Sequence, residues 1–352
     1  MITEETKRII KGLPKVDLHV HLDGSVNQQT VLELAKKQQV TLPKTTLTEL
    51  KPYLEVDEDC SDLSEYLNKF NLVAKVLHTK EALERVAYEL VARAKEQNYK
   101  YIEVRFGPQL HRAKGLSVSE VIESVIKGLT KGELTYRVKA RAIACCMRHH
   151  PTDVNKEVIR TAGEFLGKGL VGVDLAGDES AYPTHLFREV FALANQYELP
   201  VTIHAGEASG AENIKEAILN LGASRIGHGV RLKDDEKLLK KIIKQQIPLE
   251  MCPISNIQTK AANSWETYPI RDYFDQGVKV TVHTDNITVS NTTLSKEFAV
   301  LMEHFNFSII ELNQLTMNAI DASFLDYNEK ILLKKSCMEE YKRMDEMIQL
   351  VV

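Results

Sequence analysis

The sequence lacks most of the features that mark secreted, membrane-spanning or nucleic-acid-binding proteins. Its 352 residues include only five cysteines, an odd number with no CxxC pair, which argues against a disulfide framework and favours a reducing cytoplasm. No apolar run approaches membrane-spanning length, and the start, MITEETKRII, lacks the apolar core of a signal peptide. The formal net charge of −4 leaves no basic footprint for nucleic acid. We therefore expect a cytoplasmic globular protein with neither membrane nor nucleic-acid partners.

What the sequence does contain is a regular alternation of short β-rich runs and helical patterns. Candidate strands lie at residues 15–22, 99–106, 139–146, 170–176, 200–205, 225–229, 248–252 and 278–284. Most are followed by an amphipathic segment, and residues 80–98 form the clearest helix because apolar residues recur three and four positions apart. Strands and helices that alternate eight times predict an α/β fold, the (β/α)8 TIM barrel.

Two regions exceed a minimal barrel, although nothing in the composition divides the chain 1–352 into separate domains. Residues 26–98 hold several predicted helices between the first two strands, so we expect a helical insertion that forms a lid near the catalytic rim. Residues 293–352 are helical in pattern and rich in Leu, Ile and Met. We interpret them as a helical C-terminal extension that caps the barrel.

Residues that bind metals stand at the ends of three predicted strands. His19 and His21 are two positions apart, so both side chains face the same side of their strand. His204 ends a second strand, and Asp285 ends the last one. Three imidazoles and a carboxylate, with a position left for water, describe a catalytic zinc site rather than a closed structural one. The carboxyl ends of barrel strands meet at one rim, where we expect these residues to converge.

Two further residues suit the attack of metal-activated water on an sp2 carbon. His228 lies between two glycines and is placed to take the proton of that water, with Asp285 to orient it. Glu207 follows His204 by three residues and is a candidate proton donor to a ring nitrogen, which would make the adjacent carbon more electrophilic. The alternative for Glu207 is that it orients His204. We favour the proton donor and predict Glu207, His228 and Asp285 as the catalytic residues.

The segments around these residues resemble the adenosine deaminase family of metal-dependent hydrolases over essentially the whole chain. The matching pieces are KVDLHVHLDGS (15–25), YIEVRFGPQLH (101–111), CCMRHHP (145–151), VDLAGDE (173–179), IHAGE (203–207), RIGHG (225–229), CPISN (252–256) and HTDN (283–286). The resemblance implies zinc-dependent hydrolytic deamination of adenosine and 2′-deoxyadenosine to inosine and deoxyinosine, with release of ammonia, as in purine salvage. It also implies one zinc ion per chain and a purine nucleoside as the small-molecule partner.

The resemblance assigns roles to the matching residues. His19, His21, His204 and Asp285 correspond to the zinc ligands, Glu207 to the proton donor to purine N1, and His228 to the base and electrostatic partner of the attacking hydroxide. Asp23 matches the residue that holds a ribose hydroxyl, Gly177 matches the one whose backbone amide meets purine N3, and His21 also faces the substrate.

A stretch in the insertion, DLSEYLNKFNL, resembles the helix that serves as the family's lid. Its apolar residues Leu63, Tyr66, Leu67 and Phe70 are spaced to lie on one helix face. Such spacing alone is typical of ordinary helix packing. Only the resemblance makes these four residues a gate that contacts the substrate.

Two positions depart from the pattern of the better-known members. Asn286 stands where a second aspartate usually follows the metal aspartate and donates, in its protonated form, to purine N7. An asparagine amide donates without protonation, so we expect purine binding to persist with a different affinity and pH dependence. His283 stands where asparagine is usual. It shares a strand face with Asp285, which makes it a candidate support for that ligand.

Three alternatives remain beside adenosine deamination. The first is an adenine deaminase or a deaminase of another aminopurine, although adenine-specific relatives tend to have glutamate where this chain has Asp23. The second is a binuclear hydrolase, which usually needs a lysine at the end of the fourth strand; the sequence there is Asp174-Leu-Ala-Gly177. The third is a non-catalytic binding protein on the same barrel, which the retention of every ligand and of Glu207 disfavours.

Overall fold

Eight parallel strands form a closed barrel in the computed structural model, which describes residues 2–57 and 60–349. The strands are β1 (Lys15–His21), β2 (Tyr99–Phe106), β3 (Lys139–Met147), β4 (Leu170–Ala176), β5 (Thr202–Ala205), β6 (Arg225–His228), β7 (Leu249–Met251) and β8 (Val280–Val282). They pair in chain order as two four-stranded sheets, β1 to β4 and β5 to β8. Single bridges from Val173 to Val201 and from Val20 to Asp285 join these half-barrels. The predicted strands and barrel are confirmed.

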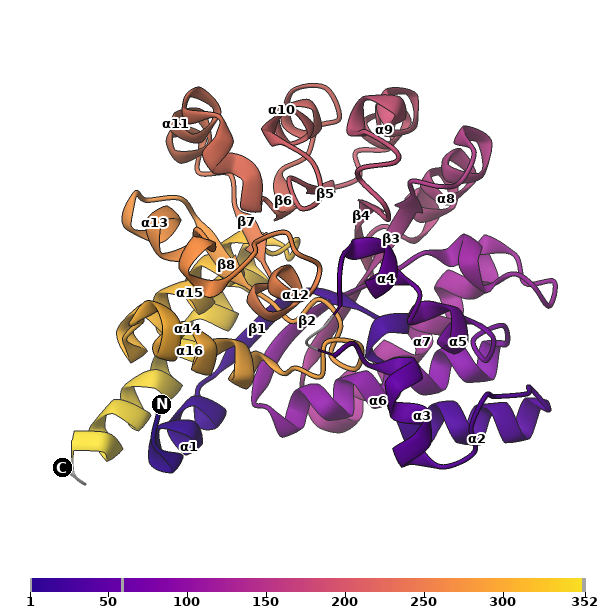
Figure 1. Ribbon diagram of the computed structural model, residues 1–352, viewed down its shortest axis with the longest axis horizontal. Helices are drawn as coiled ribbons and strands as arrows, with labels where there is room; N and C mark the ends of the chain where they lie inside the picture. Colours follow the sequence, from indigo (N-terminus) through magenta and orange to yellow (C-terminus); the bar gives the residue numbers. More distant parts are fainter. Residues whose placement is uncertain (1, 58–59, 350–352) are drawn as a thin grey trace.

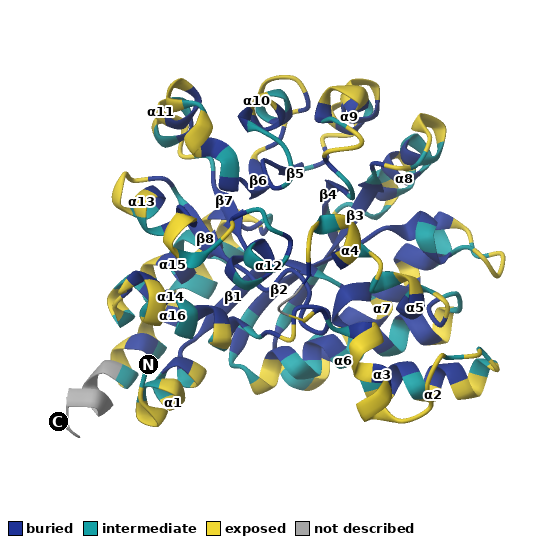
Figure 2. Cartoon of the chain, in the orientation of Figure 1, coloured by how far each residue is buried: buried dark blue, intermediate teal, exposed yellow. Residues whose placement is uncertain are grey.

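Helices enclose the strands on all sides. Figure 1 shows α8 to α11 and α13 around the strands, while α4 and α12 lie across the centre of the view. The helices outside the insertion are α1 (Glu4–Gly12), α6 (Lys80–Glu96), α7 (Val118–Tyr136), α8 (Thr152–Phe165), α9 (Arg188–Gln196), α10 (Ala211–Leu219), α11 (Glu236–Gln245), α12 (Pro253–Gln258), α13 (Ile270–Asp275), α14 (Leu294–Phe305), α15 (Ile309–Ala322) and α16 (Tyr327–Gln349). Figure 2 shows buried strands and helices whose outer faces are exposed. Strands covered in this way read as nearly continuous apolar runs, which made them visible in the sequence.

Local signals place the helices that support the site. α7 begins with a capping box, in which the Glu120 N–H donates to Ser117 Oγ at 3.1 Å and the Ser117 N–H donates to Glu120 Oε2 at 3.0 Å. Val121, Val125 and Leu129 recur every four residues and are fully or almost fully buried. α7 packs on α6 and β3, and α6 packs on β2, so the two helices hold the first half-barrel from outside.

The chain between β1 and β2 carries four helices before α6. They are α2 (Gln28–Gln38), α3 (Leu47–Leu54), α4 (Leu63–Leu67) and α5 (Phe70–Ala74). The stretch expected as one lid helix is divided into α4 and α5. At the break the Lys69 N–H donates to the Tyr66 carbonyl and the Asn71 N–H donates to the Asn68 carbonyl, so the ladder tightens to bonds between residues three apart.

The C-terminal extension is helical, as predicted. α15 packs against β8 and β1, and α16 packs against α15, so the extension covers the barrel where its first and last strands meet. The last three residues of the predicted segment, 350–352, lie outside the described residues. In the part of the chain that the structure describes, no helix combines the length and apolar character that crossing a bilayer requires.

Candidate active site

A cavity of about 450 Å³ opens at the carboxyl ends of the strands, beneath α4 and α5. The predicted site residues that line it are His21, Asp23, Leu63, Tyr66, Leu67, Phe70, Gly177, His204, Glu207, His228, Asp285 and Asn286. His19, the remaining predicted ligand, is fully buried in contact with this group. The structure therefore brings together every predicted catalytic, metal-binding and substrate-binding residue, from His19 to Asn286.

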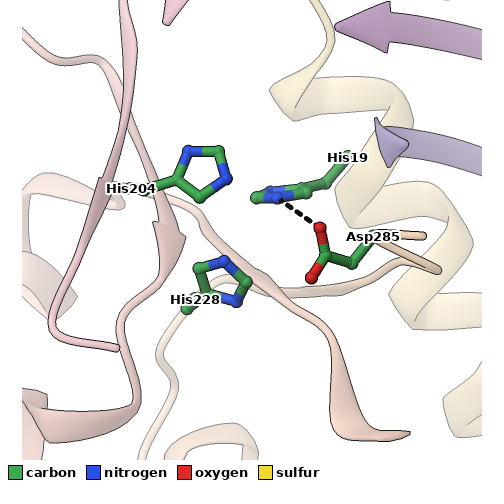
Figure 3. A group of neighbouring side chains, drawn as sticks. All are labelled: His19, His204, His228 and Asp285. Atoms are coloured by element: carbon green, nitrogen blue, oxygen red, sulfur yellow. Dashed lines mark ion pairs between the residues drawn. The ribbon is translucent and has the colours of Figure 1, made fainter. Parts of the chain in front are cut away.

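Four of these residues form a compact group that could hold a metal ion. One ligand atom from each of His19, His204, His228 and Asp285 lies within 4.8 Å of the others, and all four residues are buried. Figure 3 shows the three rings and the carboxylate gathered around a common space. His21 adjoins the group, because its Nε2 lies 3.2 Å from His204 Nε2 and 3.3 Å from Asp285 Oδ1. Five residues therefore surround the centre, one more than the four predicted metal ligands.

The hydrogen bonds of His19 and His204 place the proton of each ring on Nδ1 and leave Nε2 without one. His19 Nδ1 lies 2.8 Å from Glu250 Oε2, and His204 Nδ1 lies 3.0 Å from Asp174 Oδ2. Ionised carboxylates only accept, so both rings carry their proton on Nδ1 and turn a bare Nε2 inward. His19 Nε2 is buried without a hydrogen-bond partner. An orphaned imidazole nitrogen beside a carboxylate fits a bound metal ion.

The electrostatics of the group favour a cation. Burial raises the pKa of Asp285, but the neighbouring histidines, His19 first, hold it well below its usual range. Burial lowers the pKa of His19, but Asp285 and Glu250 raise it by more. The Ser255 hydroxyl donates to Asp285 Oδ2 at 2.6 Å, which leaves Oδ1 facing His19 and His21. The same negative field that favours a proton on His19 favours a metal ion in its place.

A buried arginine holds the two carboxylates that orient the ligands. Arg105 Nη1 donates to Asp174 Oδ2 at 3.0 Å, and Nη2 donates to Glu250 Oε2 at 2.7 Å. Burial would raise the pKa of both carboxyls, but the charges around them, Arg105 included, lower both. One guanidinium thus sets the position and the ionised state of the partners of His19 and His204.

The surroundings of Glu207 favour the role of proton donor. Glu207 does not orient His204, which was the alternative role considered for it. The Nδ1 of His204 is taken by Asp174, whereas Glu207 Oε2 lies 3.5 Å from His228 Nε2. Burial, then Asp285 and then Glu179 raise the pKa of Glu207 well above its usual range. A raised pKa favours the protonated carboxyl, the form that can donate a proton.

A second glutamate holds the loop that carries Glu207. Glu179 accepts the backbone N–H groups of four consecutive residues, Gly206, Glu207, Ala208 and Ser209, at 2.7, 3.0, 2.9 and 3.1 Å. Its side chain is almost completely buried. The loop after β5 is therefore built around one carboxylate, which fixes its backbone and adds to the field that keeps Glu207 protonated.

Two residues of the centre adopt a backbone conformation that is unusual for residues other than glycine. His228 has φ of 63° and Asp285 has φ of 57°. His228 is the last residue of β6 and Asp285 lies three residues after the end of β8, and both side chains line the cavity at the barrel mouth. Left-handed conformations in non-glycine residues store strain and gather at functional sites.

The residues expected to hold the rest of a purine nucleoside lie around the cavity. Asp23 sits in the short 3-10 helix η1 (Asp23–Ser25), where burial raises its pKa to about 6. Gly177 has φ of 106°, in the region that favours glycine, at the end of β4. Asn286 Oδ1 packs against Gly24 so tightly that a Cβ there would lie 1.7 Å from it. With Oδ1 against Gly24, the amide nitrogen is the end left for a ligand.

The four apolar lid residues divide into two kinds. Leu63, Leu67 and Phe70 line the cavity and are partly exposed. Tyr66 is buried, and its hydroxyl lies 2.6 Å from Ser290 Oγ in the loop after β8. That contact ties α4 to the segment that follows Asp285.

His283 does not support Asp285. Its Nδ1 accepts the Leu18 N–H at 3.0 Å, so its proton lies on Nε2 and faces Thr281 Oγ1 at 2.7 Å. The side chain is fully buried and joins β1 to β8. Its role is therefore to hold the two strands together.

The sequence analysis missed the residues that surround the centre. Asp174, Glu250, Glu179 and Arg105 gave no signal of their own, because carboxylates and arginines in strands and loops have no characteristic spacing. Three residues in α12 or directly after it were also missed: Ser255 donates to Asp285, Asn256 contacts His228, and Thr259 donates to Glu207 Oε1 at 3.2 Å. The segment CPISN was the available signal, since it matched the family pattern without an assigned role.

A parallel barrel whose mouth gathers histidines and an aspartate defines the class of metal-dependent β/α-barrel hydrolases. The sequence matches the family model described as adenosine deaminase over residues 14–339, so the chain belongs to the adenosine deaminase family. It is 46% identical over 330 residues to an adenosine deaminase of Clostridium botulinum (strain Okra / Type B1), a match that covers 94% of this chain and 98% of the relative.

Solved structures of two deaminases share the fold. An adenine deaminase from Arthrobacter aurescens is 25% identical with a TM-score of 0.87, covering 94% of this chain and 99% of that one. The N6-methyl-AMP deaminase from Arabidopsis thaliana is 28% identical with a TM-score of 0.83, covering 95% and 98%. The fold thus accommodates deaminases named for a free base, a nucleoside and a nucleotide.

Proposed function

We propose that this chain catalyses the hydrolytic deamination of adenosine and 2′-deoxyadenosine, giving inosine or deoxyinosine and ammonia. One observation carries the proposal: Glu207, a buried carboxyl whose pKa its surroundings raise, shares the cavity with His204, His228 and Asp285. The similarity to a named adenosine deaminase over nearly the whole of both chains supports this substrate.

The residues suited to hold one zinc ion are His19, His21, His204 and Asp285. Imidazole nitrogens and a carboxylate oxygen form a donor set that zinc accepts, and their arrangement leaves a position open. When bound, zinc supplies Lewis-acid activation of water at neutral pH. β4 ends without a lysine to bridge a second metal, which favours one ion per chain.

Glu207 supplies the proton that makes the purine reactive. Burial and the charges of Asp285 and Glu179 raise the pKa of its carboxyl, which favours the protonated form that can donate to N1. Protonation at N1 makes C6 more electrophilic and favours addition of water there. His228 lies 3.5 Å away and faces the same space, either as a base or as a hydrogen-bond donor to that water.

The remaining contacts select a nucleoside. Asp23 is positioned to hold a ribose hydroxyl, the backbone amide of Gly177 to meet N3, and the amide of Asn286 to donate to N7. The partly exposed face of α4 and α5 closes over the base with Leu63, Leu67 and Phe70, while Tyr66 holds α4 in place.

A panel of aminopurines tests the proposal. Ammonia release is measured from adenosine, 2′-deoxyadenosine, adenine and N6-methyl-AMP, before and after treatment with a chelator and after addition of zinc. We expect the highest kcat/KM with the two nucleosides, loss of activity on chelation and recovery with zinc. A higher kcat/KM for free adenine would refute the assigned substrate, and activity that survives both chelation and Glu207→Gln would refute the mechanism.

A further inference from the structure

We propose that Asn256 and Tyr268 are positioning residues that fix the proton of His228 on Nε2. His228 then meets the attacking water as a hydrogen-bond donor and not as a base or a metal ligand. The inference rests on the proposed function, because it assigns a role in that reaction. The hydrogen bonds that support it involve only protein groups and do not depend on the substrate.

The orientation of the Asn256 amide follows from its neighbours. Asn256 is fully buried in α12, and its Oδ1 lies 3.3 Å from the backbone N–H of Cys252. A backbone N–H can only donate, so the amide oxygen and not the amide nitrogen must face Cys252. The amide nitrogen is therefore the group that lies 2.9 Å from His228 Nδ1.

Tyr268 secures the same orientation from another element. Its hydroxyl lies 3.0 Å from Asn256 Oδ1 and donates to it, because a carbonyl oxygen cannot donate. Tyr268 precedes α13 and is buried, with its ring packed at 6.0 Å from the ring of Phe305. Asn256 Oδ1 thus accepts from Cys252 and Tyr268, which satisfies both lone pairs and holds the amide in one orientation.

The amide decides which nitrogen of His228 carries the proton. An amide NH2 only donates, so Nδ1 must accept and the proton of the neutral ring lies on Nε2. Nε2 points toward Glu207, with its nitrogen 3.5 Å from Oε2. A protonated Nε2 has no lone pair to offer, so His228 cannot ligate a metal although it lies within the compact ligand group.

The two neighbouring ligands show the opposite arrangement. His19 and His204 each present Nδ1 to a carboxylate, which accepts the proton and leaves Nε2 bare. A carboxylate behind the ring therefore leaves His19 and His204 able to bind a metal ion, whereas the amide behind the ring makes His228 a hydrogen-bond donor. This polarity sets His228 apart from His19 and His204 within the group.

Asn256→Asp tests the proposal directly, because it replaces the donor behind His228 with an acceptor of the same shape. Two-bond ¹⁵N–¹H correlation spectra of histidine-labelled protein, with His228 assigned by its loss in His228→Gln, report which nitrogen is protonated. We expect Nε2–H in the wild type and a proton on Nδ1 in Asn256→Asp. We also expect kcat for adenosine to fall about 10- to 100-fold with little change in KM, since Asn256 supports the centre from behind.

Two further variants keep the test independent of folding. Asn155→Asp is the matched control, an equally buried asparagine in α8 that contacts no ring of the cluster, and it should leave the His228 spectrum unchanged. Tyr268→Phe leaves the amide in place and should lower kcat by about 2- to 10-fold, the loss of one hydrogen bond. Melting curves show which variants fold.

Specific results would overturn the proposal. A proton on Nδ1 of His228 in the wild type would overturn it, and so would an unchanged tautomer and kcat in folded Asn256→Asp. An unchanged kcat in Tyr268→Phe would refute the role assigned to Tyr268. A wild-type enzyme without activity on adenosine would instead refute the proposed function, and the spectra would still decide the tautomer.

Discussion

Replacement of Glu179 by glutamine perturbs the loop that carries the proposed acid without changing its shape. The carboxylate accepts four backbone N–H groups, one on Oε1 from Gly206 and three on Oε2 from Glu207, Ala208 and Ser209. A glutamine oxygen in the place of Oε2 retains three of these bonds. Its NH2 group then faces the Gly206 N–H, so two donors meet where a donor met an acceptor.

The cost in stability can be worked from these contacts. A hydrogen bond to a charged group contributes about 1.5–3 kcal/mol, and the three retained bonds become weaker because their acceptor is neutral. We therefore expect Glu179→Gln to lower the free energy of unfolding by about 2–4 kcal/mol. Glu179→Ala leaves all four N–H groups without this acceptor and should cost more.

The same change alters the proton donor. The charge of Glu179 is one of the causes that raise the pKa of Glu207, so its removal lowers that pKa. The protonated form is the active one, and activity is lost as pH rises through the pKa of Glu207. The alkaline limb of kcat against pH must therefore move to lower pH in Glu179→Gln. Bound zinc acts on Glu207 in both enzymes, so the comparison isolates the contribution of Glu179.

Urea unfolding and kcat–pH profiles with adenosine at saturating zinc measure the two effects. Glu297→Gln serves as the control, since it also replaces a fully buried carboxyl that accepts two hydrogen bonds, but at a site that does not face Glu207. It should leave the alkaline limb in place. An unchanged free energy of unfolding together with an unmoved limb in Glu179→Gln would refute the account of this loop.

The other predictions concern the acid, the ligand support and a second buried carboxyl. Glu207→Gln should lower kcat for ammonia release by about 10²- to 10⁴-fold with little change in melting temperature, because burial and neighbouring charges already disfavour the ionised carboxylate; a loss below tenfold would contradict its role. Arg105→Lys should weaken zinc binding by about 10- to 100-fold in chelator competition. Arg225→Lys should weaken it less, since Arg225 contacts the oxygen of Glu250 that faces away from His19; equal losses would contradict this. Burial raises the pKa of Glu297 to about 8, so its contribution to stability is complete below about pH 4.5, the ordinary value, and declines as pH rises to 8. Urea unfolding at pH 5 and 8 should show a smaller decline in Glu297→Gln, and an identical decline would contradict the shift.

The barrel could be predicted because both faces of each strand are buried, so that each strand appears in the sequence as a run of apolar residues. β4 and its neighbours show this directly, and the helical periodicity of residues 80–98 marks α6. The division between α4 and α5 could not be predicted, since the tightened turn at Asn68 has no glycine or proline to signal it. The start of α1 was missed as well, although Thr3 caps it by accepting the Thr6 N–H.

The convergence of the predicted site residues could be predicted because histidine pairs and glycine-flanked polar residues at strand ends have few structural explanations. Their supports could not. Glu250 lies on β7 and orients His19 on β1, and Asn256 lies in α12 and contacts His228 on β6. Such contacts depend on the register of the closed barrel, which no local pattern encodes. The same holds for His283, whose strand face was identified but whose partners on β1 were not.

The seam between the first and last strands has a consequence for the order in which the protein matures. Backbone hydrogen bonds cross it at Asp285, whose N–H donates to the His19 carbonyl at 2.8 Å and whose carbonyl accepts from the His21 N–H at 2.7 Å. A metal held by His19, His21, His204 and Asp285 would cross-link both half-barrels at this point. During synthesis the ligands of β1 emerge first and remain without their carboxylate partner until residue 285 has been made. A metal site built from these residues would therefore form late in biosynthesis, and metal bound there would stabilise chains whose barrel has already closed.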